Sequence, residues 1–269
     1  MIELNFRLAP VSFFLRVAAM KPLLFTFLLT CLATPILPAE EASEPKPPTL
    51  PEAKAAYDKA DKRLNAVWAK AKTELDAATM ATLTTEQRDW LAYRDEQSLT
   101  SVDTDGKEVP EEKLKQTAEF LDSAAGMMDR RATWLESLLK DPGAKDSLTG
   151  VWSDSFGGEL DIVQTGAKFY FTVDVVRGPS FHTGNIGGLA SWNDPLGWFS
   201  DKGKDPEKKE ETNLAFIRRN LKMEIVAANA GDYGGARAYF DGHYVRIAKL
   251  SEKQAAKVKK EAVEGPEGR

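Results

Sequence analysis

The side chains best suited to acid–base or metal chemistry near neutral pH are the two histidines, His182 and His243. A catalytic pair or a metal site would require them to converge with carboxylates such as Asp174 and Asp241. Their spacing matches no metal-ligand motif, and each lies in or beside a Gly-rich turn. We therefore expect no catalytic residue, no metal ion and no cofactor, and we interpret the chain as a protein that is not an enzyme.

Two Gly-rich segments, 178–188 and 231–242, contain the aromatic and histidine side chains that could form a binding site. Neither segment joins a strand to a helix, so neither is a phosphate-binding loop. If the segments meet at one end of a β-barrel, they bring together a binding rim. The residues of this rim are Phe181, His182, Tyr233, Tyr239 and His243. The alternative is that the glycines serve only bulges and tight turns.

In the first half of the chain, apolar residues recur with the spacing of amphipathic helices. This spacing predicts a first helix over residues 52–78. Thr84 and Gln87 form a capping-box pattern, which predicts the start of a second helix. A third helix is expected from about Pro110 to the stop at residues 141–143. Short loops join these helices, which favours an antiparallel three-helix bundle.

After Gly143 the apolar residues alternate, with the period of about 2 that is typical of strands. The alternating runs are 150–153, 160–164, 169–176, 185–192, 198–200, 213–218, 222–227, 236–240 and 243–248. Hairpin turns are expected at Thr165-Gly166 and at Asp241-Gly242. We therefore predict an α+β fold, with an N-terminal three-helix bundle followed by an antiparallel β-barrel or sandwich domain.

The expected domain boundaries follow these changes of pattern. A helical domain spans 52–143, a β domain spans 148–250, and a charged tail spans 251–269. Residues 40–51 form a Pro-rich linker that we expect to be disordered. Residues 1–39 have the features of a signal peptide and are set aside from the fold.

The N-terminal segment indicates export. A basic residue precedes the apolar run 23–36, which is too short to span a bilayer comfortably, and Ala39 offers a cleavage site. Met20 can serve as an alternative start. Leu-Leu-Thr-Cys, ending at Cys31, resembles a lipobox, so lipid anchoring on Cys31 is the competing interpretation. We expect a periplasmic or secreted protein that meets the membrane only through the signal or such an anchor.

The charge balance of the chain is acidic. It holds 36 Lys and Arg against 41 Asp and Glu, a net charge of −5. Cleavage after Ala39 removes three basic residues and one acidic residue, so the net charge becomes −7. This balance argues against nucleic acid or an anionic membrane as a partner. It suits a basic protein partner, and it is also what solubility alone would require.

The two predicted helices at the start of the chain resemble the LprI-type lysozyme inhibitor family. The residues that carry the resemblance are Tyr57, Asp61, Leu64, Asn65, Gln87, Arg88, Trp90, Leu91, Tyr93, Arg94 and Asp95. They cover only the helical domain, about a third of the chain. The family usually has a disulfide whose one cysteine closely follows the Tyr-Arg-Asp triplet. In this chain Ser98 stands at that place. The second cysteine of the family's disulfide lies ahead of the first helix, and this chain has no cysteine there.

These motif residues are chemically suited to holding two helices together. Arg94 can make a two-pronged contact with Asp58 or Asp61. Asn65 can satisfy backbone groups at a helix end, and Trp90 supplies apolar area for a small core. The alternative is that the motif residues contact a binding partner directly.

The resemblance implies an exported envelope protein that binds a lysozyme, a basic one being the natural partner of an acidic chain, and blocks it by occlusion. The alternative is a periplasmic module whose β domain binds a glycan or a small ligand. A third hypothesis is a hydrolase that uses a histidine and a carboxylate. The second predicts a roomy, aromatic-lined barrel mouth, and the third predicts a histidine beside a carboxylate in one cleft.

Overall fold

The fold is described here from a computed structural model of the chain. It describes residues 46–178, 180–203 and 210–264. The expected signal peptide, with Met20 and Cys31, and residues 40–45 of the Pro-rich linker lie outside these ranges. None of the helices within the described ranges is long and apolar enough to cross a membrane.

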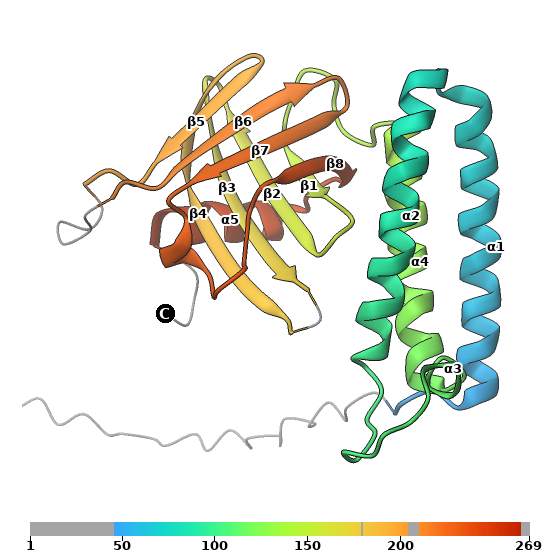
Figure 1. The fold of residues 1–269 in the computed structure, drawn as a ribbon. Coiled ribbons are helices and arrows are strands. Elements are labelled where there is room, and N and C mark those ends of the chain that lie inside the picture. Colours follow the sequence, from blue (N-terminus) through green and yellow to red (C-terminus); the bar gives the residue numbers. More distant parts are fainter. Residues whose placement is uncertain (1–45, 179, 204–209, 265–269) are drawn as a thin grey trace, which may run out of the picture. The chain divides into compact units, whose positions relative to one another are not determined.

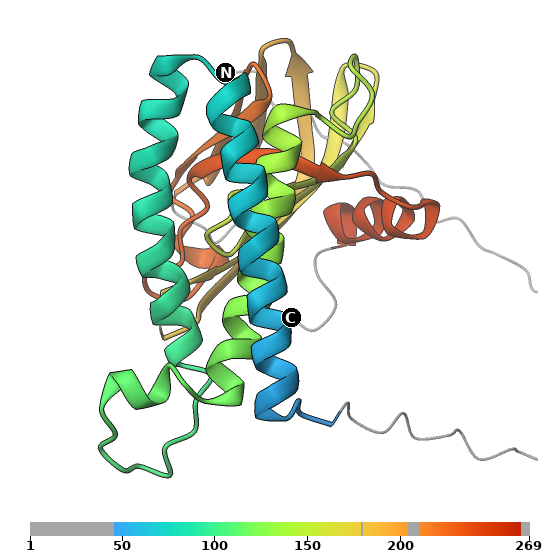
Figure 2. The ribbon, with the colours of Figure 1, turned by 90° about the vertical axis from the view of Figure 1, so that its right-hand side faces the viewer.

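Three long helices form the first half of the described chain. The long helices are α1 (Leu50–Glu74), α2 (Ala77–Leu99) and α4 (Ala118–Leu139), and a short helix, α3 (Glu111–Leu114), precedes α4. In Figures 1 and 2, α1, α2 and α4 lie side by side and run alternately up and down, and α3 lies in the connection between α2 and α4. The predicted three-helix bundle is therefore confirmed.

The second helix begins well before the predicted cap. Asp76 is its N-cap, and the carboxylate accepts the backbone N–H groups of Ala78 and Thr79, both at 3.0 Å. Thr84 lies inside the helix, where its hydroxyl donates to the Met80 carbonyl at 2.7 Å. The predicted capping box at Thr84 is wrong, because the better capping residue Asp76 has already started the helix.

The first helix begins at Leu50, within the segment 40–51 that was predicted to be a linker. The backbone N–H of Thr49 donates to the Glu52 carboxylate at 2.8 Å and caps the helix. Pro51 lies in the first turn, where its missing N–H leaves no helical bond unmade. Leu50 and Pro51 are therefore helical, although proline at this point was expected to prevent a helix.

Helix α4 is the most buried of the bundle because it is covered on two sides. Helices α1 and α2 pack on one side, and strand β8 (Gly242–Ala248) of the barrel packs on the other. Met128, Ala132 and Leu135 are fully buried there, and Val245 of β8 joins the same apolar cluster. Helices and barrel thus share a core within one compact unit that begins at Lys46.

Eight antiparallel strands within the described residues close into a barrel in sequence order, with β1 paired to β8. The strands before β8 are β1 (Gly150–Ser153), β2 (Gly158–Thr165), β3 (Lys168–Arg177), β4 (His182–Asn193), β5 (Leu196–Ser200), β6 (Asn213–Arg219) and β7 (Lys222–Ala228). Figure 1 shows this barrel beside the bundle. The predicted α+β fold is confirmed, and the β domain is a barrel rather than a sandwich.

Two local predictions in the barrel differ from the structure. Residues 236–240 form no strand, and they follow the short 3-10 helix η1 (Gly231–Tyr233) as turn and extended chain. Their apolar alternation reflects the burial of Phe240 in the barrel core. The hairpin turn at Thr165-Gly166 is confirmed, whereas Asp241-Gly242 is no hairpin turn, because Gly242 opens β8 after a longer loop.

Phenylalanine rings fill the interior of the barrel. The ring centroid of Phe216 lies 5.0 Å from that of Phe169 and 4.9 Å from that of Phe171, both in edge-on arrangements. Gly188 on β4 leaves room for another ring, since a Cβ at this position would overlap the ring of Phe199. The barrel is therefore a packed core, as is usual for eight strands, and not an open cup.

The charged tail folds back as helix α5 (Glu252–Glu264), which packs on the outside of β2, β3 and β4. Val258 and Ala262 form its buried face. Carboxylates of the barrel lie near this helix. Burial, and then repulsion by Glu159 and Asp174, raise the pKa of Asp161 to about 7. The Asp161 side chain thus titrates close to neutral pH.

We predict that ionisation of Asp161 weakens the folded state as the pH rises. The folded pKa of about 7 lies above the usual 3.8, so the protonated form favours folding. The stabilisation of the folded state by protonated Asp161 is fully present below about pH 4. It is lost as the pH rises from about 4 to about 7. Lys257 of α5 attracts the ionised carboxylate, whereas Glu261 of α5 adds to the repulsion.

The variant Asp161→Asn removes this titration. In urea denaturation the variant should be more stable than wild type by about 1–2 kcal/mol near pH 8 and equally stable near pH 4. This difference in unfolding free energy is smaller than the pKa shift alone would give, because solvent screens the charge of the partly exposed carboxylate. Asp146→Asn, at an exposed position, is the matched control. Equal pH profiles for the two variants would contradict the prediction.

Candidate functional site

Two tryptophan side chains attach the helices to the barrel. The indole N–H of Trp90 on α2 donates to the backbone carbonyl of Ser155 at 3.1 Å. The indole N–H of Trp134 on α4 donates to the carbonyl of Ser153 at 2.9 Å. Each tryptophan is only 1% exposed. Both acceptors lie at the end of β1 and in the loop after it, so the two bonds meet at one corner of the barrel.

Arg131 lies buried against both indole rings. Its guanidinium carbon is 4.3 Å from the ring centroid of Trp134 and 5.6 Å from that of Trp90. Its Nε donates to the Gln87 side chain at 2.9 Å, and Nη1 donates to Glu86 at 3.0 Å. Burial lowers the pKa of Arg131, and the Glu86 carboxylate opposes this shift. The motif residue Gln87 thus helps to hold a cation against the two tryptophans.

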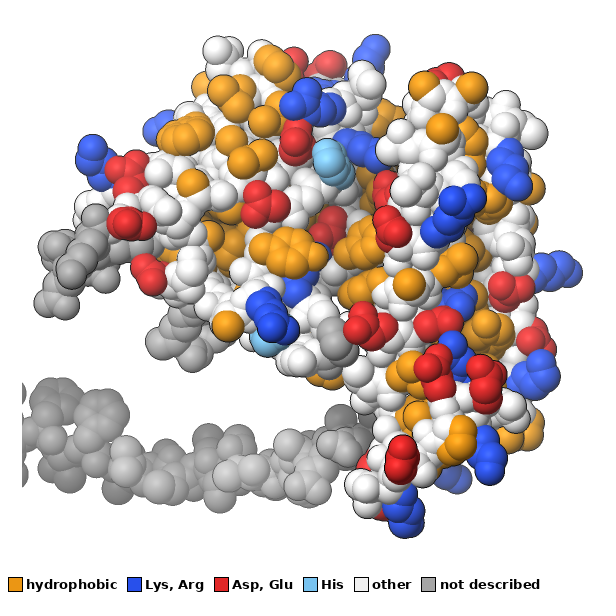
Figure 3. Space-filling model, in the orientation of Figure 1, with side chains coloured by type: hydrophobic (Ala, Val, Ile, Leu, Met, Phe, Trp, Pro, Cys, Tyr) orange, Lys and Arg blue, Asp and Glu red, His pale blue; other side chains and the backbone are white. Residues whose placement is uncertain are grey.

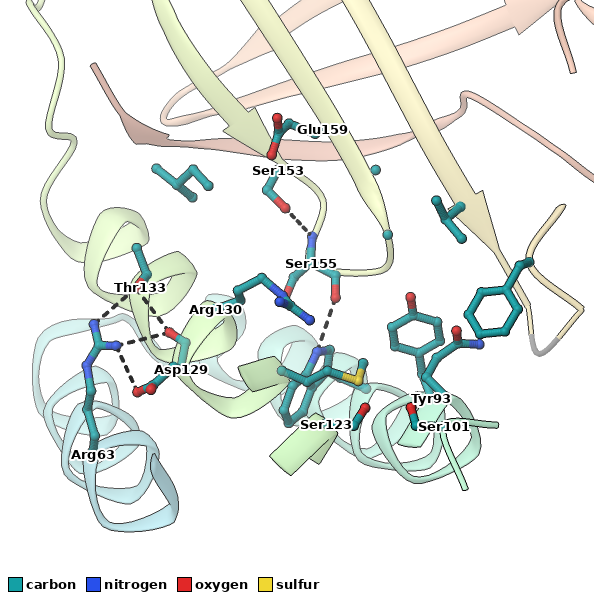
Figure 4. A pocket seen from close by; sticks show the side chains of 18 residues that line it. Arg63, Tyr93, Ser101, Ser123, Asp129, Arg130, Thr133, Ser153, Ser155 and Glu159 are labelled. Atoms are coloured by element: carbon teal, nitrogen blue, oxygen red, sulfur yellow. Dashed lines mark hydrogen bonds and ion pairs between the residues drawn. The ribbon is translucent and has the colours of Figure 1, made fainter. Parts of the chain in front are cut away.

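Beside these contacts, a cleft of about 630 Å³ opens between the helices and the barrel, and we name it the helix–barrel cleft. Its helical wall consists of Arg63, Trp90, Tyr93, Gln97, Ser101, Ser123, Met127, Asp129, Arg130 and Thr133. Its barrel wall consists of Ser153, Ser155, Gly157, Gly158, Glu159, Val176, Phe181 and Ile247. Figure 4 shows these side chains from close by. The volume lies within the range of small-molecule sites.

Ion pairs hold one side of the cleft. The Arg63 guanidinium of α1 contacts Asp129 at 3.1 Å and Glu136 at 2.8 Å, and it donates to the Thr133 hydroxyl at 3.0 Å, all on α4. Figure 4 shows part of this network with dashed lines. Arg63 and Asp129 therefore compensate one another's charge and fix α1 against α4.

The two Gly-rich segments contact one another in the structure. Gly184 forms a β-bridge with Gly234, and the backbone N–H of Gly235 donates to the Thr183 carbonyl at 2.9 Å. A Cβ at Gly184 would lie 3.0 Å from the ring of Phe240, so a larger residue would crowd this contact. The glycines thus serve the close approach of two backbones.

The structure separates the five predicted rim residues. Phe181 lines the helix–barrel cleft, whereas Tyr239 and His243 line a second pocket of about 220 Å³. The Tyr233 hydroxyl donates to Asp201 at 2.9 Å. His182 begins β4, opposite the last residue of β3. They do not form one rim, and a role of any of them in binding stays a prediction.

His243 does lie beside a carboxylate, with its Nε2 3.9 Å from Oε1 of Glu224. Glu224 is also paired with Arg219. Asp154 lines the same 220 Å³ pocket as His243. Its carboxylate accepts a hydrogen bond from the Arg177 guanidinium at 2.6 Å and from two backbone N–H groups at 2.8 Å. These carboxylates are committed to structural contacts, which disfavours proton transfer. The described residues contain no cluster of His, Cys, Asp and Glu that could hold a metal ion.

Most motif residues of the family resemblance hold the bundle together. Leu64 is buried, Tyr57 packs against the helical core, and the amide of Asn65 donates to Asp61 at 3.0 Å. Asn65 therefore lies within α1 and does not serve a helix end as predicted. Ser98, at the place of the family's cysteine, is buried with its hydroxyl 3.8 Å from the sulfur of Met127.

The predicted partner of Arg94 is wrong. Its guanidinium contacts the neighbouring Asp95, through Nε at 2.9 Å and Nη2 at 2.5 Å, and not Asp58 or Asp61 on α1. Lys115 approaches the other oxygen of Asp95 at 3.2 Å. Asp95 therefore ties α2 to the segment after α3, whereas the Arg94 guanidinium also lies 3.5 Å from the sulfur of Met128 on α4.

Several cleft residues were not singled out in the sequence, among them Gln97, Arg130 and Glu159. One local signal was present. Adjacent helical residues point about 100° apart, so the Arg130-Arg131 pair cannot bury both side chains on one face. Arg131 is buried against the tryptophans, and Arg130 is exposed at the cleft. Which of the two is buried depends on where the barrel lies.

These features define an α+β protein in which a three-helix bundle is fixed to a closed barrel, with a polar cleft at the junction. Residues 43–135 match the family described as Lysozyme inhibitor LprI. The match confirms the resemblance for the helical region, covers about a third of the chain, and includes no part of the barrel. Comparison with curated proteins and with solved structures finds no match to the chain.

We predict that the indole N–H of Trp90 contributes measurably to stability. The variant Trp90→Phe keeps most of the ring but leaves the Ser155 carbonyl without its donor, which should cost about 1–3 kcal/mol. Trp90→Ala should cost about 3–5 kcal/mol because it also leaves a cavity. Denaturation followed by circular dichroism measures both values.

Trp68→Phe is the matched control, because Trp68 packs on the same helical core and makes no hydrogen bond to the barrel. It should cost less than Trp90→Phe. An equal loss in the two variants would show that the bond to Ser155 is not what stabilises the junction.

Proposed function

We propose that this protein is an exported inhibitor that binds a lysozyme and blocks access to its substrate cleft. The observation that carries the proposal is the match of residues 43–135 to the lysozyme inhibitor family. Inhibition by occlusion requires no chemistry from the inhibitor, since a folded protein seated over a cleft excludes the substrate. A stable interface of this kind buries about 800 Å² on each partner.

Burial limits which motif residues could touch a lysozyme. Trp90 and Leu64 are buried, and Gln87 and Arg94 are engaged within the bundle. Asn65 on α1 and Arg88 on α2 are the exposed members with large polar side chains. If the helical region makes the contact directly, these two positions are where the motif can take part.

The charge of the chain supports a basic partner. A chain that begins at Glu40 would carry a net charge of −7. Attraction to a basic enzyme would speed association, and the rate would fall with salt because exposed charges are screened within about 8–10 Å. Charge alone also produces weak and unspecific pairs, so binding has to be measured together with inhibition.

Ligand binding by the barrel is the alternative, and its interior supports it poorly because phenylalanine rings fill the space. The outer face of the barrel offers a different surface. Figure 3 shows apolar side chains gathered over β5, β6 and β7. Trp198 there is 49% exposed and in register with Ala215, which in turn pairs with Val226. Exposed apolar patches often mark interaction sites.

We predict that the chain beginning at Glu40 inhibits muramidase activity saturably, and that inhibition survives moderate salt while association slows. The measurement is muramidase activity of several lysozyme types against titrated protein at low and physiological salt. Absence of inhibition by micromolar protein for all of them would refute the proposal.

Two variants locate the contact. The double variant Asn65→Ala and Arg88→Ala should weaken inhibition about tenfold, or roughly 1.4 kcal/mol, if the helical face binds. Trp198→Ala is the matched test of the barrel face. Loss of inhibition in the second variant alone would assign binding to the barrel and leave the helices as support.

A further inference from the structure

Among the donors that line the helix–barrel cleft, three large side chains have no hydrogen-bond partner within the described residues. The side-chain amide nitrogen of Gln97 is buried and donates to no described residue, and Gln97 as a whole is only 8% exposed. The Tyr93 hydroxyl and the Arg130 guanidinium likewise make no hydrogen bond or ion pair within the described chain. In Figure 4, Arg130 extends from α4 into the space between helices and barrel, and no dashed line reaches it.

All three groups are donors at neutral pH. Burial, and then the Asp154 carboxylate, raise the pKa of Tyr93 to about 12, so its hydroxyl keeps its proton. The nearby Arg130 acts on this hydroxyl in the opposite direction, which places the two groups within electrostatic reach. A buried amide N–H without an acceptor costs about 1–3 kcal/mol. An acceptor that enters the cleft would recover this cost.

The acidic groups of the cleft do not neutralise Arg130. Asp129 is paired with Arg63 at 3.1 Å. Glu159 belongs to the acidic face of the barrel, because the charges that act on it are those of Asp174 and Lys257. The cation of Arg130 therefore has no ion pair among the described residues, and it lines the same cleft as two neutral donors.

Apolar groups line the remaining wall. The Phe181 side chain is 51% exposed, and Val176 and Met127 lie in the same cleft. The backbone of Phe181 has a φ of 49°, in the left-handed region that residues other than glycine rarely adopt. Strain of this kind persists only where the surroundings enforce it. The turn thereby holds an exposed ring in the lining of the cleft.

We propose that the helix–barrel cleft binds a small organic carboxylate, with Arg130, Tyr93 and Gln97 as donors to the carboxylate and Phe181 against its apolar body. Ionic hydrogen bonds from Arg to a carboxylate are the strongest contacts available to such a group. The volume of about 630 Å³ suits a sugar acid or a short peptide end. The site does not depend on lysozyme binding.

Two pairs of probes test the proposal by NMR titration of the chain that begins at Glu40. N-acetylmuramic acid is compared with N-acetylglucosamine, which lacks the carboxylate. N-acetylphenylalanine is compared with its neutral amide. We expect at least one carboxylate to shift the amide signals of residues 93–101 and 123–130 saturably, and its neutral counterpart to have no such effect. The pair that responds shows whether a sugar acid or a peptide-like acid is preferred.

The variants decide whether the cleft is the site. Arg130→Gln should weaken binding of the responding carboxylate about tenfold or more, and Tyr93→Phe by several-fold. Arg237→Gln, an exposed position outside the cleft with the same charge change, should bind as wild type. Unchanged thermal melting shows that each variant is folded.

Two results would overturn the proposal. One is that neither carboxylate causes saturable shifts at millimolar concentration. The other is that Arg130→Gln and Arg237→Gln weaken binding equally, which would indicate general attraction to a cationic surface. Muramidase inhibition measured on Arg130→Gln keeps the two proposals apart, because inhibition should persist when carboxylate binding is lost.

Discussion

The two bonds from indole N–H groups to barrel carbonyls are the constraint on which the arrangement of the described residues depends. Trp90 and Trp134 come from different helices but donate to carbonyls two positions apart, those of Ser155 and Ser153. Two bonds from separate helices to one short segment fix the rotation of the bundle as well as its distance. The helix–barrel cleft lies directly beside them, with Trp90, Ser153 and Ser155 in its walls. The residues that fix the junction therefore also shape the walls of the cleft.

The buried Arg131 makes the junction sensitive to substitution of its ion-pair partner. A buried ion pair gains little net free energy, but removing one member leaves an uncompensated charge. The partner Glu86 also faces Lys222 of β7 at 3.8 Å, and the Lys222 nitrogen lies 5.3 Å from the ring centroid of Trp134. One carboxylate thus serves a cation from α4 and a cation from the barrel. Loss of Glu86 would leave these two cations near the same indole ring without an anion between them. The network favours a single relative placement of helices and barrel.

The apolar spacing of the chain identified the bundle and eight of the nine strand runs, but local patterns alone misplaced an element start. The sequence contains the Thr-x-x-Glu/Gln pattern at Thr49 and again at Thr84. At Thr49 the pattern caps a helix, because prolines precede it and no helix can continue from before. At Thr84 the same pattern lies within a helix already begun after Asp76. The difference is set by what precedes each pattern. Residues 236–240 mislead for a related reason, since burial of Phe240 produces alternation without a pairing partner.

Some residues of the candidate site could be singled out from the sequence, but their assembly into one site could not be predicted from it. Trp90 and Tyr93 belong to the family resemblance, and Phe181 to a Gly-rich segment, yet only docking of the barrel on the bundle brings them to one cleft. The family match at residues 43–135 contains both anchoring tryptophans but ends before the carbonyls that they contact. Helices cut off before the barrel would expose two large indoles and leave Arg131 without its cover. The helical region of this chain is therefore completed by the barrel. The barrel covers the part of α2 and α4 that carries the two tryptophans, so this part of the helical surface is not free for contact with another protein.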